Sequence, residues 1–199
     1  MLCTLHIEDP MKAGSIYLVI HEPTIQTCED DVEKKDVMQV EKTSHFGIAV
    51  DITGSSTAEE LIATHYDLYV KGATDFTTYI EAKLKRRPWD YYHSVRKIGQ
   101  FPLGEITSFV IPHSFARNLE NRLLQFVYSS LYLQNNGVRW SSILNCQTMT
   151  RSAIEYLGYT FPDDIQLITD IVPTMFDLYV NVDLATTQTY KKSKEKLPH

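Results

Sequence analysis

The sequence predicts an α+β fold in which a small antiparallel sheet packs against helices on one side. Two alternating apolar runs, residues 44–51 and 61–68, flank a turn that contains Gly54, as expected for a β-hairpin. Residues 114–134 and 146–157 instead repeat apolar positions every three or four residues, the period of an amphipathic helix. A chain of 199 residues with 43% hydrophobic content suffices for one core, so we expect a single domain throughout.

Charge and cysteine content narrow the classes of function. A net charge of −6 and a pI near 5.6 argue against a nucleic-acid groove, which requires a basic face. The cysteines Cys3, Cys28 and Cys146 form no CxxC pair, and the N-terminus has no signal-like apolar run. We therefore expect a reducing, cytoplasmic setting. No run approaches the roughly 18 apolar residues of a spanning helix, so no transmembrane segment is expected.

The first elements in chain order are a strand at residues 15–20 and a charged stretch at residues 24–43. We interpret this stretch as a solvated connection. The alternative is a cover over the substrate side of the functional site. The first hairpin strand then places His45 on the same face as Gly47 and Ala49. Because small side chains let another backbone approach closely, we expect this face to accept the helix predicted to begin at Cys146.

The second hairpin strand carries His65 and Asp67 on one face. A symmetric register sets His65 opposite His45, although the loop permits a shift by two residues. The same register places Ala63 opposite Gly47. His65 is then the candidate third group, which orients the imidazole of His45 as the third member of a triad does.

Four further elements are expected before the helix that begins at Cys146. Asp75 is predicted to cap a helix that ends at the basic residues before Pro88. Its expected inner stripe is Phe76, Tyr79, Ile80 and Leu84. Residues 91–98 and 105–111 read as strands, and residues 114–134 as a long helix. The expected inward residues of that helix are Phe115, Leu119, Leu123, Val127 and Leu131.

Cys146 begins the last predicted helix, which ends where Gly158 suits a left-handed stop. The apolar stripe of this helix consists of Cys146, Met149, Ala153, Ile154 and Leu157. A thiol in a first turn lies near unpaired backbone N–H groups and the positive end of the helix dipole, which favour the thiolate. With His45 as a base, Cys146 is a candidate nucleophile. The alternative is a buried cysteine that acts only as a small apolar residue.

Competing chemistries lack their motifs. The seven histidines show no HxH or HExxH spacing, so a metal site would need ligands from separate elements. The sequence has no GxSxG elbow and no glycine-rich phosphate loop. We therefore expect no metal and no cofactor.

The order of the motifs resembles a known family. The chain has an HFGIAV strand that begins at His45, then His65 on the following strand, then a helix that opens with Asn145, Cys146 and Gln147. This order is similar to the circularly permuted NlpC-type papain-like thiol enzymes, and most similar to their lecithin:retinol acyltransferase and H-rev phospholipase/acyltransferase group. The resemblance implies a permuted papain-like fold with Cys146 as nucleophile, His45 as base and His65 as third polar residue.

The resemblance covers roughly residues 12–158, and the chain departs from the family pattern at several positions. Met149 stands where an aromatic residue is usual, and the segment between the histidines is longer. Residues 159–199 read as an extension with a disordered basic tail, without the family's C-terminal membrane helix.

The expected function is thiol-dependent acyl transfer, as a hydrolase or acyltransferase, on a lipid or other acyl ester through a thioester. One oxyanion donor is expected to be the backbone N–H of Cys146. A cysteine peptidase or amidase of the NlpC type is the first alternative, because a thiolate attacks the carbonyl carbon of an ester and of an amide in the same way. A catalytically inactive binding module on the same fold is the second. The sequence defines neither the acyl acceptor nor an oligomeric state.

Overall fold

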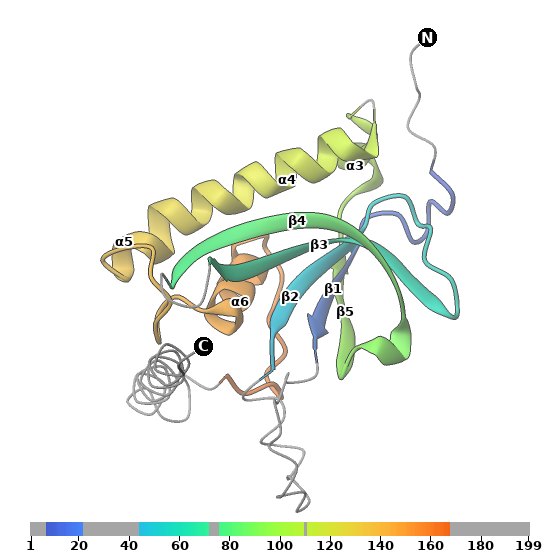
Figure 1. The fold of residues 1–199 in the computed structure, drawn as a ribbon. Helices are drawn as coiled ribbons and strands as arrows, with labels where there is room; N and C mark the ends of the chain where they lie inside the picture. The colour runs from blue at the N-terminus through green and yellow to red at the C-terminus, as the bar shows by residue number, and fades with distance from the viewer. Residues whose placement is uncertain (1–6, 22–43, 72–75, 110, 168–199) are drawn as a thin grey trace, which may run out of the picture.

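The computed structural model describes residues 7–21, 44–71, 76–109 and 111–167, and within them the chain forms one antiparallel sheet with helices (Figure 1). The sheet has five strands in the order β4-β3-β2-β1-β5. The strands are β1 (Ser15–Ile20), β2 (Phe46–Asp51), β3 (Glu60–Lys71), β4 (Thr77–Pro88) and β5 (Ser94–Gln100). The predicted α+β class and the β2–β3 hairpin are confirmed.

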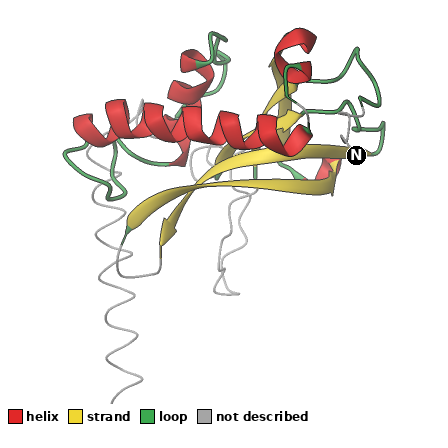
Figure 2. Cartoon of the chain, turned by 90° about the horizontal axis from the view of Figure 1, so that it is seen from above, coloured by secondary structure: helices red, strands yellow, loops and turns green. Residues whose placement is uncertain are grey.

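One short helix lies between β4 and β5, and the other helices follow β5. They are η1 (Trp89–Tyr91), α3 (Leu103–Thr107), α4 (Pro112–Phe126), the π-helical η2 (Val127–Leu131), α5 (Tyr132–Gln134) and α6 (Cys146–Tyr156). The helix predicted for residues 114–134 is observed as α4, η2 and α5 in succession, lying along the sheet (Figure 2). All its predicted inward residues are buried. It starts earlier than expected because Pro112, which needs no N–H partner, occupies its first turn.

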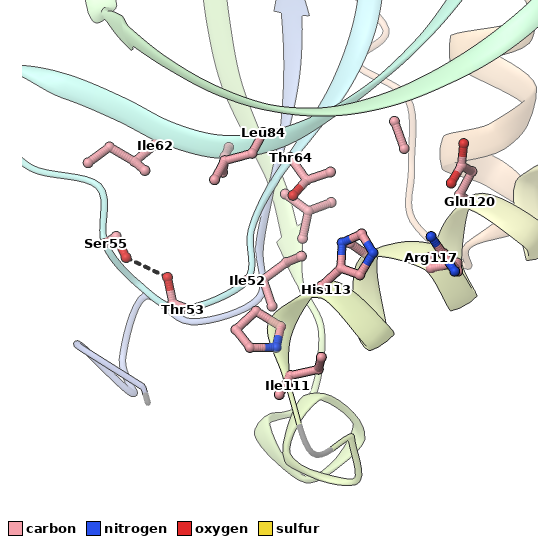
Figure 3. Close-up of a pocket in the computed structure, with 15 residues that line it drawn as sticks. Ile52, Thr53, Ser55, Ile62, Thr64, Leu84, Ile111, His113, Arg117 and Glu120 are labelled. Carbon is pink, nitrogen blue, oxygen red and sulfur yellow. Dashed lines mark hydrogen bonds between the residues drawn. The ribbon is translucent and has the colours of Figure 1, made fainter. Parts of the chain in front are cut away.

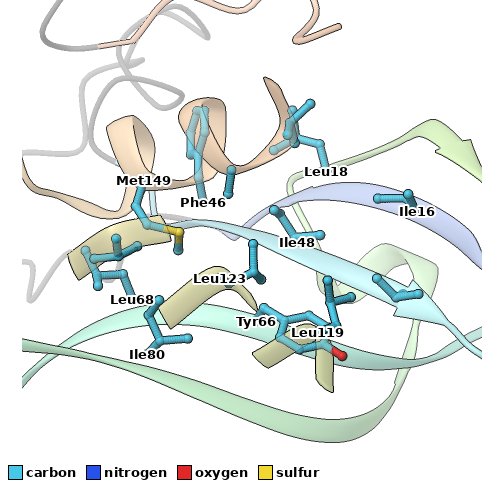
Figure 4. Close-up of a cluster of buried hydrophobic side chains, with 14 of the residues drawn as sticks. Ile16, Leu18, Phe46, Ile48, Tyr66, Leu68, Ile80, Leu119, Leu123 and Met149 are labelled. Carbon is cyan, nitrogen blue, oxygen red and sulfur yellow. The ribbon is translucent and has the colours of Figure 1, made fainter. Parts of the chain in front are cut away.

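The main core lies between the helices and one face of the sheet (Figure 4). Its sheet residues include Ile16, Leu18, Ile20, Phe46, Ile48, Val50, Tyr66 and Leu68, and its helix residues include Phe115, Leu119, Leu123, Met149, Ala153 and Ile154. The Tyr66 hydroxyl donates a hydrogen bond of 3.1 Å to the carbonyl of Ala116. This bond joins β3 to α4 inside the core.

The face on which α6 packs differs from the prediction. Met149 and Ile154 of α6 lie in one cluster with Phe46 and Ile48, which point away from the His45 face. The opposite face, which carries Ala49, forms a smaller apolar cluster of Val19, Ala49, Leu61, Ala63 and Tyr92. The apolar stripe of α6 requires an apolar partner surface, and Phe46 and Ile48 provide it.

Two predicted elements are of the wrong type. The segment predicted as a helix after Asp75 is strand β4, because Phe76, Ile80 and Leu84 are spaced by four and this spacing suits either period. Continuous pairing of β4 with β3 decides in favour of the strand. Residues 105–111 were expected to form a strand, but α3 occupies residues 103–107 and buries Ile106. Asp75 itself lies outside the described residues.

The other predictions are matched or fall outside the described residues. The strand expected at residues 91–98 is observed as β5, and Gly158 has the left-handed φ of 86°. Among the described residues no helix is long and apolar enough to cross a bilayer. The connection at residues 24–43 and the basic tail lie outside the part of the chain that is described.

Candidate active site

Cys146 is the first residue of α6, and its helix start is fixed by a capping box. The side chain of Asn145 accepts the N–H groups of Gln147 and Thr148, each at 3.0 Å. The Thr148 hydroxyl accepts the N–H of Asn145 at 3.1 Å. The cap does not use the N–H of Cys146. The thiol is therefore held at a rigid helix N-terminus, 6% exposed, beside a backbone donor.

The start of α6 is tied to the start of β2. The side-chain amide of Gln147 is buried and donates a hydrogen bond of 3.2 Å to the carbonyl of Ser44. Ser44 directly precedes His45, so this bond brings the cysteine turn to the histidine. The side chain of Cys146 lies near enough to the imidazole of His45 to raise the pKa of His45. The structure therefore brings together the predicted nucleophile and base.

The third group in contact with His45 is Asp67, not His65. The Nε2 atom of His45 lies 3.2 Å from Oδ1 of Asp67, whose side chain is 1% exposed. In the observed hairpin register Gly47 pairs with Asp67 and Ala49 pairs with His65. The predicted register, with His65 opposite His45 and Ala63 opposite Gly47, is therefore wrong.

The physical reason for the register lies in the loop between β2 and β3. The carboxylate of Asp51 accepts the N–H groups of Gly54, Ser55 and Ser56 at 2.8–2.9 Å. These bonds wrap the chain into a turn before the hairpin closes, so strand pairing is centred further along the chain than a symmetric turn implies. The shift brings Asp67 to the row in which Ala63 was expected.

Gly47 makes room for the Asp67 carboxylate. A Cβ atom at Gly47 would lie 2.1 Å from Asp67 Oδ1, far inside van der Waals contact. The small residues on the His45 face were expected to accept the cysteine helix, whereas Gly47 accommodates the Asp67 carboxylate.

Asp67 is held as a carboxylate by its surroundings. Lys85 Nζ donates to Oδ2 at 2.8 Å, and the Tyr69 hydroxyl donates to the same oxygen at 3.3 Å. Burial favours the neutral acid, but the bonds from His45 and Lys85 prevail and hold the pKa of Asp67 well below its usual range. The Tyr69 ring stacks on His45 with centroids 5.3 Å apart, which restricts the imidazole orientation.

The electrostatics of His45 favour its protonated form. Burial lowers the pKa of His45, but the hydrogen bond to Asp67 and the interaction with Cys146 outweigh burial and raise it to about 9. An imidazole with this preference accepts a proton from a neighbouring thiol readily.

His65 and His21 lie on the same face of the sheet as Asp67, but their pKa values are lowered, whereas that of His45 is raised. His65 is fully buried, and its Nε2 lies 3.0 Å from the hydroxyl oxygen of Tyr92. Burial lowers the pKa of His65 to about 3. The His21 ring lies with its centroid 5.4 Å from that of His45, and burial together with repulsion from His45 lowers its pKa to about 4. Both rings are therefore neutral at pH 7.

A cavity of about 560 Å³ opens at the other end of β2 (Figure 3). Its walls include Ile52 directly after β2, Ile62 from β3, and His113, Arg117 and Glu120 from α4. Its lining does not include Cys146, His45 or Asp67. The cavity is therefore separate from the thiol and its partners.

Comparison with known proteins adds no identification, since no family model, no curated protein and no solved structure matches this chain.

Asp67, Lys85 and Tyr69 were not proposed from the sequence as site residues. Asp67 was placed on the same face as His65, which was the one available signal. The sequence predicts a helix over the segment that contains Lys85, and a helix there would not pair with the hairpin strands. Only the observed pairing of β3 with β4 places Lys85 beside Asp67.

Proposed function

We propose that this protein is a thiol-dependent acyl-transfer enzyme, a hydrolase or acyltransferase whose acyl donor is a lipid ester. The observation that carries the proposal is the arrangement of three side chains, in which Cys146 lies near His45 and His45 lies 3.2 Å from buried Asp67. A nucleophile, a base within reach and a group that orients the base are the parts that covalent acyl transfer requires. The choice of a lipid ester is supported by the resemblance of the HFGIAV strand and the Asn145-Cys146-Gln147 turn to the acyltransferase group.

In the proposed mechanism, His45 removes the thiol proton of Cys146. Because Nε2 of His45 is bonded to Asp67, Nδ1 is the nitrogen that receives the proton. The thiolate attacks the ester carbonyl carbon, and the N–H of Cys146 donates a hydrogen bond to the resulting oxyanion. The carbon–oxygen bond of the ester then breaks, and the imidazolium of His45 protonates the departing alkoxide. A thioester on Cys146 remains.

The second half of the reaction releases the acyl group. Water or another hydroxyl or amine acceptor gives its proton to His45 and attacks the thioester carbon. The carbon–sulfur bond breaks and the thiolate of Cys146 recovers a proton from His45. The products are a carboxylic acid with water, or a new ester or amide with another acceptor. Asp67 remains a carboxylate throughout and stabilises each imidazolium state.

A cysteine peptidase or amidase is the alternative, and the electrostatics of His45 also suit it. An amine leaving group must be protonated as it departs, and the interactions that raise the pKa of His45 to about 9 provide an imidazolium for that step. The same residues would have the same roles.

The test is to incubate the purified protein with a panel of acyl-lipid esters and a panel of peptides. Intact-mass spectrometry with peptide mapping then locates any acyl adduct. We expect a lipid acyl group on Cys146 and none in Cys146→Ala. Adducts or cleavage with peptides alone would favour the alternative, and turnover retained by Cys146→Ala would exclude both.

A further inference from the structure

A second group of side chains surrounds the Asp67 carboxylate on the same face of the sheet. His21 directly follows β1, and His65 lies on β3 beside Asp67. One ligand atom from each of His21, His65 and Asp67 lies within 4.8 Å of the other two. Two imidazoles and one carboxylate are a donor set that divalent transition metals use in proteins. The ligands come from separate strands, so no short spacing motif in the sequence indicates them.

Each of the two imidazoles has a buried nitrogen without a partner in the described part of the chain. These atoms are Nε2 of His21 and Nδ1 of His65. His65 is 0% exposed and Asp67 is 1% exposed, so water does not reach them freely. A buried polar atom left without a hydrogen bond destabilises the fold. An ion held by the three residues would give such nitrogens a partner.

The other nitrogen of His65 has the contact expected of a metal ligand. Its Nε2 lies 3.0 Å from the Tyr92 hydroxyl oxygen. When Nε2–H donates to that oxygen, Nδ1 keeps its lone pair for an ion. Histidine ligands commonly donate their second ring N–H in this way, which fixes both tautomer and ring orientation.

One neighbour opposes a bound cation. The Lys85 ammonium lies 2.8 Å from Asp67 Oδ2, and its side chain is 16% exposed. This charge limits the affinity of the group for a divalent ion. Removal of the Lys85 charge should therefore strengthen ion binding, which provides a test in the opposite direction from loss of a ligand.

We propose that His21, His65 and Asp67 form a binding site for one divalent transition-metal ion of the class represented by Zn²⁺, with an open coordination position. Tetrahedral Zn²⁺ with ligands at about 2.1 Å separates ligand atoms by about 3.4 Å, so ligand atoms that lie within 4.8 Å of one another move closer by up to about 1.4 Å on binding. The ion shares the carboxylate that holds His45, so its binding slows the reaction of Cys146. That consequence rests on the proposed function, whereas ion binding does not.

The experiment is calorimetric titration of the full chain with Zn²⁺ in a Cys146→Ala background, which removes the thiol as a ligand. His21→Ala and His65→Ala are compared with His113→Ala, a matched control at an exposed histidine of α4. We expect affinity to fall about tenfold or more in the first two and to stay unchanged in the control. Lys85→Met should raise affinity by about threefold or more.

Equal Zn²⁺ affinity in the background and in both ligand variants would overturn the proposal, as would weaker binding in Lys85→Met. If Cys3 or Cys28 held the zinc, the His21 and His65 substitutions would leave the affinity unchanged, which is one of these contradicting results. If His65→Ala does not fold by circular dichroism, half-buried His21 and Lys85 still decide the matter. The background lacks the thiol, so failure of the acyl-adduct experiment leaves this test unaffected.

Discussion

Gly47 is the residue whose size determines whether the Asp67 carboxylate fits against the sheet. We predict that Gly47→Ala lowers the free energy of unfolding by about 1–3 kcal/mol, the usual cost of overpacking. The reason is the 2.1 Å approach of the added Cβ to Asp67 Oδ1, which displaces the carboxylate from His45. Urea denaturation measures the loss.

The matched control is Gly104→Ala in α3, where an added Cβ meets no atom within 4 Å. Alanine has the higher helix propensity, so this variant should be neutral or more stable by up to about 1 kcal/mol. A similar destabilisation in the two variants would mean that the space over Gly47 has no special role.

Asp67 is the residue through which we expect His45 to be oriented. Asp67→Asn should lower kcat by about 10- to 10⁴-fold, because an amide neither stabilises the imidazolium nor fixes its tautomer. Tyr69→Phe is the control, since it removes one hydroxyl from Oδ2 and keeps the ring stacked on His45. Steady-state kinetics on the ester identified by the adduct experiment gives both values. Equal losses in the two variants would contradict the orienting role of Asp67.

At the scale of elements, the cap of α6 positions the thiol. Asn145→Ala removes the acceptor of two first-turn N–H groups and also the donor to the carbonyls of Ser141 and Ser142. We predict a loss of about 1–2 kcal/mol in unfolding free energy, the upper range for a cap. Asn118→Ala, on the exposed side of α4, should change stability by less than about 0.5 kcal/mol. A loss in Asn145→Ala no larger than that of the control would mean that the capping box does not hold α6.

Elements with an unambiguous period were predictable from the sequence, and those with mixed signals were not. The helices that contain Leu119 and Cys146 repeat apolar residues over several turns, and both are observed. The segment of β4 has apolar residues spaced by four, which local sequence cannot assign to one period. Its strand state comes from pairing along β3. The basic residues of β4 lie on a strand at the edge of the sheet, where charge discourages association with other chains.

The whole molecule depends on the core between α4, α6 and the sheet. Leu119→Ala should lower the free energy of unfolding by about 2–5 kcal/mol, because the removed methyl groups leave a cavity at a fully buried position. Leu133→Ala, at a leucine that is 74% exposed, should change it by less than about 0.5 kcal/mol. Urea denaturation with equal m-values would show one cooperative unit. Equal losses in both variants would contradict the observed core.

The candidate site was predictable only where its residues lie in local patterns. Cys146 stands at a recognisable helix start and His45 at the start of an alternating strand, so both were found from the sequence. Asp67 and Lys85 depend on the registers of β3 against β2 and β4, which the Asp51 turn and long-range pairing determine. A change of register by a few residues alters the partner without changing any local signal.

The central claim is that His45 activates Cys146 as a nucleophile. The rate of alkylation of each cysteine by iodoacetamide at neutral pH, resolved by peptide mass spectrometry, tests it most directly. We predict that Cys146 reacts faster than Cys3 and Cys28, and that His45→Ala slows Cys146 by about tenfold or more, whereas His113→Ala does not. An unchanged rate for Cys146 in His45→Ala would contradict the account.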